Sequence, residues 1–221
     1  MMNNLKYLLV LVCITLLYSC KEGQKLESKD GFAVVPAPKK GESVATFSGG
    51  CFWAMQECMI ELKGVNKVIS GYAGGTTKNP SYDDVTSQTT GHAESVQVYY
   101  DPSVITYDQL VNAFFHAHDS TQENGQGPDI GSDYRSIAFY RNAAERETIE
   151  KVITMVNSDG AYQHPVVTET LPFTVFYGAE SNHQDYYKRN VWEPYIRNVS
   201  KPKVIKLRKA LPGLIKSNYL D

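Results

Sequence analysis

Strand and helix patterns alternate along this chain from residue 44 onwards, but several neighbouring strand patterns have no helix between them. A fully alternating order would build a parallel sheet, whereas strands that follow one another directly favour antiparallel pairs. The order therefore predicts a compact α+β fold of two layers, with a mixed or antiparallel sheet and flanking helices. The expected strands are residues 44–47, 67–73, 93–100 and 137–140, with short ones near 166 and 175; the expected helices are residues 51–62, 106–116, a third from 142, and a helix or turn at 180–189.

Local signals refine this pattern at three places. Thr106 and Asn142 stand where side-chain oxygens can cap the second and third helices. Residues 118–134 are polar and rich in glycine, so we expect a long loop there. Long loops inside compact domains usually carry function, which makes this segment a candidate part of a site.

Length and composition exclude several classes of protein. The 221 residues suit one globular domain, and 42% hydrophobic with 21% charged residues argue against disorder and against a polytopic membrane protein. A formal net charge of −2 leaves no basic excess for a phosphate backbone, so we expect no nucleic-acid partner. No cluster of cysteine and histidine has the spacing of a zinc site, and we expect no bound metal.

The first twenty residues have the pattern of an export signal. Lys6 precedes an apolar run at residues 8–17, which is too short to span a bilayer, and Ser19-Cys20 follows. This end resembles a bacterial lipoprotein cleavage site, with residues 1–19 as the signal and Cys20 as the acylated residue. Residues 20–43 would be a lipid-anchored flexible tether, and the membrane-anchored protein would face the periplasm or the cell exterior. The alternative is a signal anchor with an incidental cysteine.

Cys51 follows two glycines at the predicted start of a helix. Unpaired N–H groups and the positive end of the helix dipole stabilise a thiolate at such a position. Phe52 and Trp53 come next, and at least one of them should be exposed as an aromatic wall for a small apolar group. From position alone, a buried structural cysteine is an equally good interpretation.

The string GCFWA at residues 50–54 resembles the signature of peptide methionine sulfoxide reductase A. The resemblance covers about residues 44–190, and further strings match other blocks of the family in the same order. These strings are GYAGG at 71–75, NPSY at 79–82, TGHAE at 90–94, VQV at 96–98, YDP at 100–102, HD at 118–119, TQ at 121–122, QGPDIG at 126–131, YRS at 134–136, AE at 179–180 and HQ at 183–184. It implies a catalytic domain at residues 44–221 that is a two-layer sandwich with a ferredoxin-like core. The implied enzyme reduces the S epimer of methionine sulfoxide, free or in oxidised exported proteins.

The resemblance also implies a role for each polar site residue. The Cys51 thiolate attacks the sulfoxide sulfur, and Glu94, with a pKa raised by burial, donates the proton that the departing oxygen needs. Tyr82 and Tyr134 would hydrogen-bond the sulfoxide oxygen, and Asp129 would be a further polar partner near it. Without the resemblance, Glu94 would be a solvated strand residue and Asp129 a turn residue.

The apolar half of the site and its regeneration follow from the same resemblance. Phe52 and Trp53 would hold the S-methyl group, and no cofactor would be bound. Many members of the family carry resolving cysteines near the C-terminus, but residues 190–221 contain none. Cys58 is the remaining thiol, and seven helical residues place it about 10 Å from Cys51, beyond disulfide range. We therefore expect an external thiol, such as a thioredoxin-like protein, to reduce the sulfenic acid on Cys51.

Two other functions stay open on the sequence alone. We expect the reductase to be a monomer. A surface lipoprotein could instead use the same domain as a binding or adhesion module, although such a module has no need for a thiol and an acid. A cysteine hydrolase could use His92 or His183 as its base, although this would not explain the GCFWA string. His116 and His118 resemble a metal pair, but two residues apart at a helix end they point in different directions.

Overall fold

The structure, a computed structural model, describes residues 24, 26–160 and 162–220. Residues 1–23, which include the predicted export signal and Cys20, lie outside the described part. Six strands form the main sheet in the order β10-β4-β5-β3-β8-β9, with every pair antiparallel except β8 and β9, which run parallel. Their bounds are β3 Ser43–Gly49, β4 Val65–Ala73, β5 Ala93–Tyr100, β8 Ser136–Tyr140, β9 Glu169–Pro172 and β10 Phe176–Gly178.

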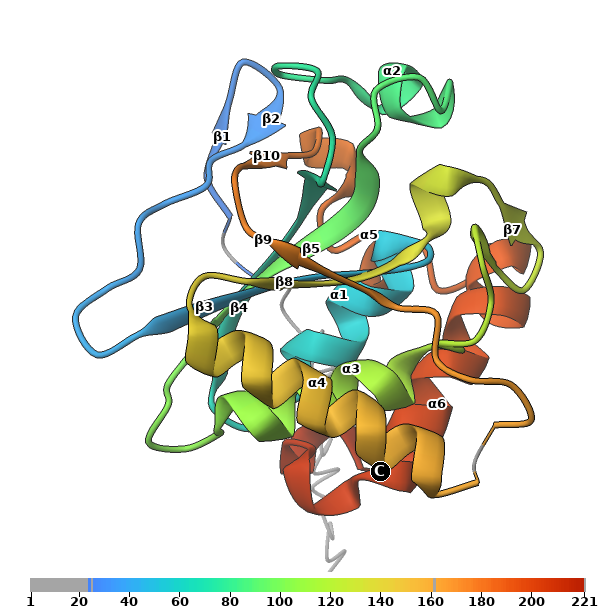
Figure 1. The fold of residues 1–221 in the computed structure, drawn as a ribbon. Helices are drawn as coiled ribbons and strands as arrows, with labels where there is room; N and C mark the ends of the chain where they lie inside the picture. The colour runs from blue at the N-terminus through green and yellow to red at the C-terminus, as the bar shows by residue number, and fades with distance from the viewer. Residues whose placement is uncertain (1–23, 25, 161, 221) are drawn as a thin grey trace, which may run out of the picture.

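The larger helices cover one face of this sheet (Figure 1). The order β3-α1-β4-β5-α3-β8, with the four strands paired as β4-β5-β3-β8, is a ferredoxin-like unit and confirms the predicted two-layer α+β class. No helix in the described residues is long and apolar enough to cross a membrane. The helices are α1 Phe52–Ile60, α2 Tyr82–Thr86, α3 Tyr107–Ala117, α4 Ala143–Ser158, α5 Tyr186–Arg189 and α6 Lys201–Ala210, with 3-10 turns at Ser132–Tyr134, Ser181–His183, Pro212–Leu214 and Ser217–Tyr219 and a π-helical turn at Ile196–Ser200.

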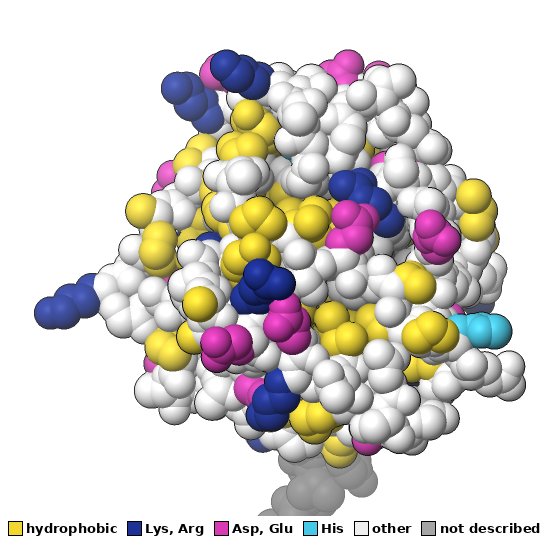
Figure 2. Space-filling model, viewed as in Figure 1, with side chains coloured by type: hydrophobic (Ala, Val, Ile, Leu, Met, Phe, Trp, Pro, Cys, Tyr) yellow, Lys and Arg dark blue, Asp and Glu magenta, His cyan; other side chains and the backbone are white. Residues whose placement is uncertain are grey.

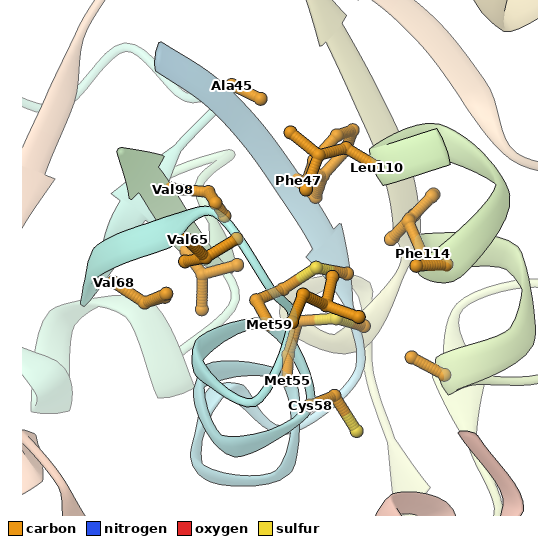
Figure 3. Packing of buried hydrophobic residues seen from close by; sticks show 14 of the residues in the cluster. Ala45, Phe47, Met55, Cys58, Met59, Val65, Val68, Val98, Leu110 and Phe114 are labelled. Carbon is orange, nitrogen blue, oxygen red and sulfur yellow. The ribbon is translucent and has the colours of Figure 1, made fainter. Parts of the chain in front are cut away.

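The main core lies between the sheet and α1, α3 and α6 (Figure 3). Phe47 on β3 stacks on Phe114 of α3 with ring centroids 4.8 Å apart. Met55 and Met59 from α1 fill the space beside these rings, since their unbranched side chains adapt to irregular gaps. This packing holds the first turn of α1 against the end of β3.

The described part of the segment predicted as a tether, residues 24 and 26–43, includes residues that pack on the opposite face of the sheet. Residues 28–33 form a small hairpin of β1 (Ser28–Lys29) and β2 (Phe32–Ala33). Ala33 is buried and its N–H donates to the Ala179 carbonyl at 2.9 Å, while the Tyr99 hydroxyl donates to the Pro36 carbonyl at 2.7 Å. The apolar residues scattered among the polar ones of this segment pack on a second core, which the overall polar composition concealed.

Most predicted elements are confirmed, with differences near their ends. Thr106 and Asn142 are N-caps, accepting hydrogen bonds from the backbone N–H groups three residues later. The strand predicted near residue 166 is wrong, because pairing with β8 begins only at Glu169. The loop at residues 118–134 contains a short hairpin of β6 (Gly125–Gln126) and β7 (Asp129–Ile130) before a 3-10 turn.

The C-terminal residues fold back onto α1 through α6. Glu61, fully buried at the end of α1, forms a two-point ion pair with Arg208 of α6, with N···O distances of 2.7 and 2.5 Å. Lys216 adds to this connection, since its ammonium donates to the carbonyls of Ile60 and Val65. On the face in Figure 2, acidic and basic side chains are intermixed.

Replacing Arg208 with alanine should lower the free energy of unfolding by about 3–5 kcal/mol, because the buried Glu61 carboxyl would lose its partner. Urea unfolding of the purified chain measures this. Lys209→Ala, at the exposed neighbouring position, is the control and should change stability by less than about 0.5 kcal/mol. The double variant Glu61→Leu/Arg208→Leu should recover most of the loss; an Arg208→Ala variant as stable as the control would contradict the argument.

Candidate active site

A tight turn places Cys51 directly before α1. β3 ends at Gly49, and Gly50 has a φ of +79°, a conformation that disfavours any side chain. A Cβ atom at Gly50 would also lie 2.5 Å from the Gln126 side chain. Glycine is therefore required there, and the turn directs the Cys51 thiol into a cavity at the N-terminus of α1.

This cavity has a volume of about 340 Å³, within the size range of small-molecule sites. It collects side chains from segments that are far apart in sequence, including the loop predicted to carry function and the C-terminal tail. Of the seven residues assigned to the catalytic and substrate-binding site from the sequence, six line it and Phe52 does not. The lining residues are Cys51, Trp53, Tyr82, Glu94, Asp129, Tyr134, Glu193 and Tyr195.

Glu94 lies on β5 beneath the start of α1 and is buried. One carboxyl oxygen accepts the Phe52 backbone N–H at 2.9 Å, so it occupies a donor that the first turn of the helix leaves unpaired. Burial raises the pKa of Glu94 to about 8, and the hydrogen bond from Phe52 only partly opposes this effect. The group is therefore a neutral acid at pH 7, as expected for a proton donor.

The Cys51 thiol is also buried, and this corrects the expectation of a thiolate stabilised by the helix. Burial raises the pKa of Cys51 well above its usual range, and the nearby Glu94 carboxyl raises it further. Hydrogen bonds with Tyr195 and the Trp53 N–H oppose the shift without cancelling it. The first backbone N–H of α1 donates to Glu94 and does not stabilise the sulfur. The effect of burial on the Cys51 pKa is larger than that of the helix dipole, so Cys51 is a protonated thiol at neutral pH.

Tyr82 and Tyr134 face the same cavity from α2 and from the 3-10 turn after β7. Glu180 positions the first of them, since its carboxylate accepts the Tyr82 backbone N–H at 2.8 Å. Burial and the neighbouring Glu94 raise the pKa of Tyr82 to about 12, and the same causes raise the pKa of Tyr134 further. Both phenols keep their protons at neutral pH and are hydrogen-bond donors to an oxygen in the cavity.

Tyr195 is a site residue that the sequence did not reveal. Its hydroxyl donates to the Asp129 carboxylate at 2.7 Å and lies within hydrogen-bonding reach of Cys51. The interaction with Tyr195 lowers the pKa of Cys51, as expected for a phenol that can turn its proton from Asp129 toward the sulfur. Lys203 of α6 approaches Asp129 to 3.9 Å. Tyr195 is one of fifteen tyrosines and belongs to no motif, so only the folding of the tail identifies it.

The two aromatic residues after Cys51 have different positions. Trp53 lines the cavity, stacks on Tyr186 with ring centroids 3.8 Å apart, and donates its indole N–H to His183 at 3.2 Å. Phe52 is fully buried and does not line the cavity, and its ring centroid is 5.4 Å from that of His183. Trp53 is thus the apolar wall that a ligand meets, and Phe52 supports it.

The histidines hold the structure around the site. His92 accepts the Gly75 N–H on one ring nitrogen and faces the Thr77 carbonyl at 2.8 Å with the other. His118 is buried against Ser136 at 2.7 Å, and burial lowers its pKa to about 4. In the described part of the chain no histidine lines the cavity, and no group of three or more potential ligand residues could hold a metal ion. A histidine base for hydrolysis is therefore missing beside Cys51.

Comparison with known proteins agrees with this geometry. The sequence model of the family described as "Peptide methionine sulfoxide reductase" matches residues 43–212. Proteins named peptide methionine sulfoxide reductase MsrA are similar: the chain is 45% identical to that of Natronomonas pharaonis over 175 residues and 43% identical to that of Thermus thermophilus over 175 residues, in each case 79% of this chain and 98% of the relative.

Solved structures show the same fold. Mxr1 from Saccharomyces cerevisiae in reduced form gives a TM-score of 0.67 at 30% identity, covering 72% of this chain and 92% of Mxr1. Methionine sulfoxide reductase A of Corynebacterium diphtheriae gives 0.64 at 30% identity, covering 79% of this chain and 92% of that protein. The residues that the family model matches, 43–212, contain the strand, turn and helix that carry Cys51. By sequence along most of its length and by fold, this chain is an oxidoreductase of the peptide methionine sulfoxide reductase family.

Proposed function

We propose that the protein reduces the S epimer of methionine sulfoxide, free or in proteins, with Cys51 as nucleophile and Glu94 as acid. The observation that carries the proposal is the presence of a buried thiol and a buried neutral carboxyl in one small cavity. A binding module gains nothing from such a pair, since burying both groups costs stability. A hydrolase would need a base, and the cavity offers an acid instead.

The reaction balances with the groups present. Cys51 Sγ bonds to the sulfoxide sulfur as the thiol proton and the Glu94 proton pass to the sulfoxide oxygen, which leaves as water. Water then adds to Sγ, the bond between the two sulfur atoms breaks, and a proton returns to Glu94. Methionine is released, reduced by two electrons, and Cys51 becomes a sulfenic acid, oxidised by two electrons. The two buried groups hold the two protons that the departing oxygen requires.

The phenols stabilise charge that develops on the oxygen. Tyr82 and Tyr134 keep their protons in this site, so both donate to the oxygen as the S–O bond lengthens. Such donors in a desolvated cavity lower the barrier most when they are fixed beforehand, and Glu180 fixes Tyr82.

The lining also accounts for the proposed stereochemistry. The cavity lining combines polar groups, among them Glu94, with the apolar ring of Trp53. A sulfoxide placed with its oxygen toward Glu94 has its methyl group toward Trp53, which is a favourable sulfur–aromatic environment. In the opposite epimer the oxygen and the methyl group would exchange places. The oxygen would then lie against the Trp53 ring, without a hydrogen-bond donor. We therefore assign activity to a single epimer.

Regeneration is proposed to use an external thiol, such as a thioredoxin-like protein. Cys58 lies on α1 with its side chain fully buried in the core, and the helix is continuous from the position after Cys51 to Cys58. Seven helical residues place the Cα atoms of Cys51 and Cys58 about 10 Å apart, beyond disulfide range unless the helix unwinds. Two reducing equivalents from outside would convert the sulfenic acid to a thiol and release water.

The cellular setting is proposed from the N-terminal pattern, which precedes the described residues. We propose that the chain is exported, acylated on Cys20 and anchored in a membrane, where it repairs oxidised exported proteins. The export signal and Ser19-Cys20 support this proposal. The packed N-terminal segment leaves little free chain between the domain and Cys20, so the domain would lie close to the membrane surface.

Replacing Glu94 with glutamine should lower kcat/KM about 10²- to 10⁴-fold at pH 7, because the amide keeps the shape but supplies no acidic proton. In the unaltered protein the rate should fall as pH rises through about 8, where Glu94 loses its proton. The variant should lack this limb of the pH profile. Turnover of resolved sulfoxide epimers with dithiothreitol measures both effects.

Cys51→Ser is the control for background turnover in that assay and should be inactive while still folded. A Glu94→Gln variant with an unchanged rate at neutral pH would remove Glu94 from the mechanism. Equal turnover of both epimers would refute the stereochemical assignment.

One equivalent of substrate without reductant should leave a trappable sulfenic acid on Cys51, visible by mass spectrometry after reaction with dimedone. Cys58→Ala should turn over at a near-normal rate, because the proposed route does not use that thiol. Rapid formation of a disulfide between Cys51 and Cys58, at the rate of turnover, would show that α1 unwinds and that the external-thiol route is wrong.

Cys20→Ala should block acylation and leave a larger, unprocessed form, with less protein in the lipid-associated fraction. Metabolic labelling with a fatty acid and fractionation measure this. Cys13→Ala is a matched control inside the signal and should be processed normally. Recovery of the unaltered chain as a cytoplasmic protein that still begins at Met1 would contradict the proposal.

A further inference from the structure

Trp192 and Ile130 are the most exposed large hydrophobic side chains in the described part of the chain, with 84% and 74% of their surface in solvent. Each is next to a residue that lines the active-site cavity, since Ile130 follows Asp129 and Trp192 precedes Glu193. Single exposed hydrophobic residues are ordinary on a protein surface. Two large ones beside the same cavity call for another explanation.

The local structure around Trp192 does not require an apolar residue. The Glu193 N–H donates to the Asn190 carbonyl at 3.0 Å, which closes a turn with Val191 and Trp192 at its central positions. Turns of this kind favour glycine, proline, asparagine or aspartate at their centre. Here the turn instead exposes Trp192 and a further apolar side chain, Val191, which is 44% exposed.

This turn is fixed to the cavity wall. The Tyr186 hydroxyl donates to both carboxylate oxygens of Glu193, at 3.0 and 2.9 Å, and the Tyr186 ring stacks on Trp53. Trp53 is the apolar wall of the cavity. Tyr186 therefore connects the turn that carries Trp192 to the wall of the cavity.

The β6–β7 hairpin, which carries Ile130, is held in the same way. The Tyr195 hydroxyl donates to Asp129 at 2.7 Å and so ties this hairpin to the C-terminal tail. Ile130, Val191 and Trp192 together form what we call the apolar rim. The hydrogen bond keeps the two sides of the rim in place around one cavity.

We propose that the apolar rim binds hydrophobic side chains that neighbour a methionine sulfoxide in a polypeptide. This inference rests on the proposed function. With the sulfoxide in the cavity, the adjacent residues of an extended chain lie about 3.3 Å further out per step, over the residues beside the lining. Oxidation of a buried methionine makes it polar and disrupts the core around it, so the segments that need repair are rich in apolar neighbours.

Three substrates test the inference with dithiothreitol as reductant: N-acetyl-methionine sulfoxide, a peptide with glycine and serine on both sides of the sulfoxide, and a peptide with leucine and valine there. The unaltered protein should have a kcat/KM about tenfold higher for the apolar peptide than for the glycine–serine peptide. Trp192→Ala should remove most of this preference. It should change kcat/KM for N-acetyl-methionine sulfoxide by no more than about twofold. Ile130→Ser should reduce the preference in the same direction.

Met155→Ala is the matched control, because Met155 is exposed on α4, away from the cavity lining. This variant should leave kcat/KM unchanged for all three substrates. Equal kcat/KM for the two peptides, or a Trp192→Ala loss shared by all three substrates, would overturn the inference. A loss seen only with a thioredoxin-type reductant would also overturn it, since the rim would then bind the reductant. Failure of every substrate would instead refute the proposed function.

Discussion

The hydrogen bond from the Phe52 backbone N–H to the buried Glu94 carboxyl, 2.9 Å long, joins the start of α1 to the central strand β5. It occupies the donor that would otherwise stabilise a thiolate at the helix N-terminus, and it brings the acid beside Cys51. Burial then raises the pKa of both groups, so each keeps its proton at neutral pH. In the proposed mechanism, the same desolvation that weakens Cys51 as a nucleophile keeps two protons beside the sulfoxide oxygen.

The C-terminal tail completes this arrangement from the other side. Tyr195 lies between Cys51 and Asp129, and Lys203 approaches the same carboxylate. The tail stays in place because α6 is tied to α1 through the buried pair of Glu61 and Arg208. A segment without cysteines therefore contributes to the cavity through packing and hydrogen bonds.

Several features of the fold could be predicted because their causes are local. The order of strands and helices along the chain indicated the two-layer class. Thr106 and Asn142 could be predicted as N-caps because each side-chain oxygen accepts the backbone N–H only three residues later. The packing of residues 26–35 on the sheet could not be predicted from their polar composition, which is a local property. That packing depends on a sheet face assembled from distant strands.

The sequence by itself determined the candidate site: the GCFWA string, Glu94 and the two predicted tyrosines are recognisable without coordinates, and all but Phe52 of the predicted catalytic and substrate-binding residues line one cavity. Only the tertiary structure decided the protonation of Cys51, the supporting position of Phe52, and the presence of Tyr195 and Glu193 in the site. A pKa depends on the solvent and charges that surround a group. Those surroundings come from β5, the β6–β7 hairpin and the C-terminal tail, which only folding brings to the start of α1.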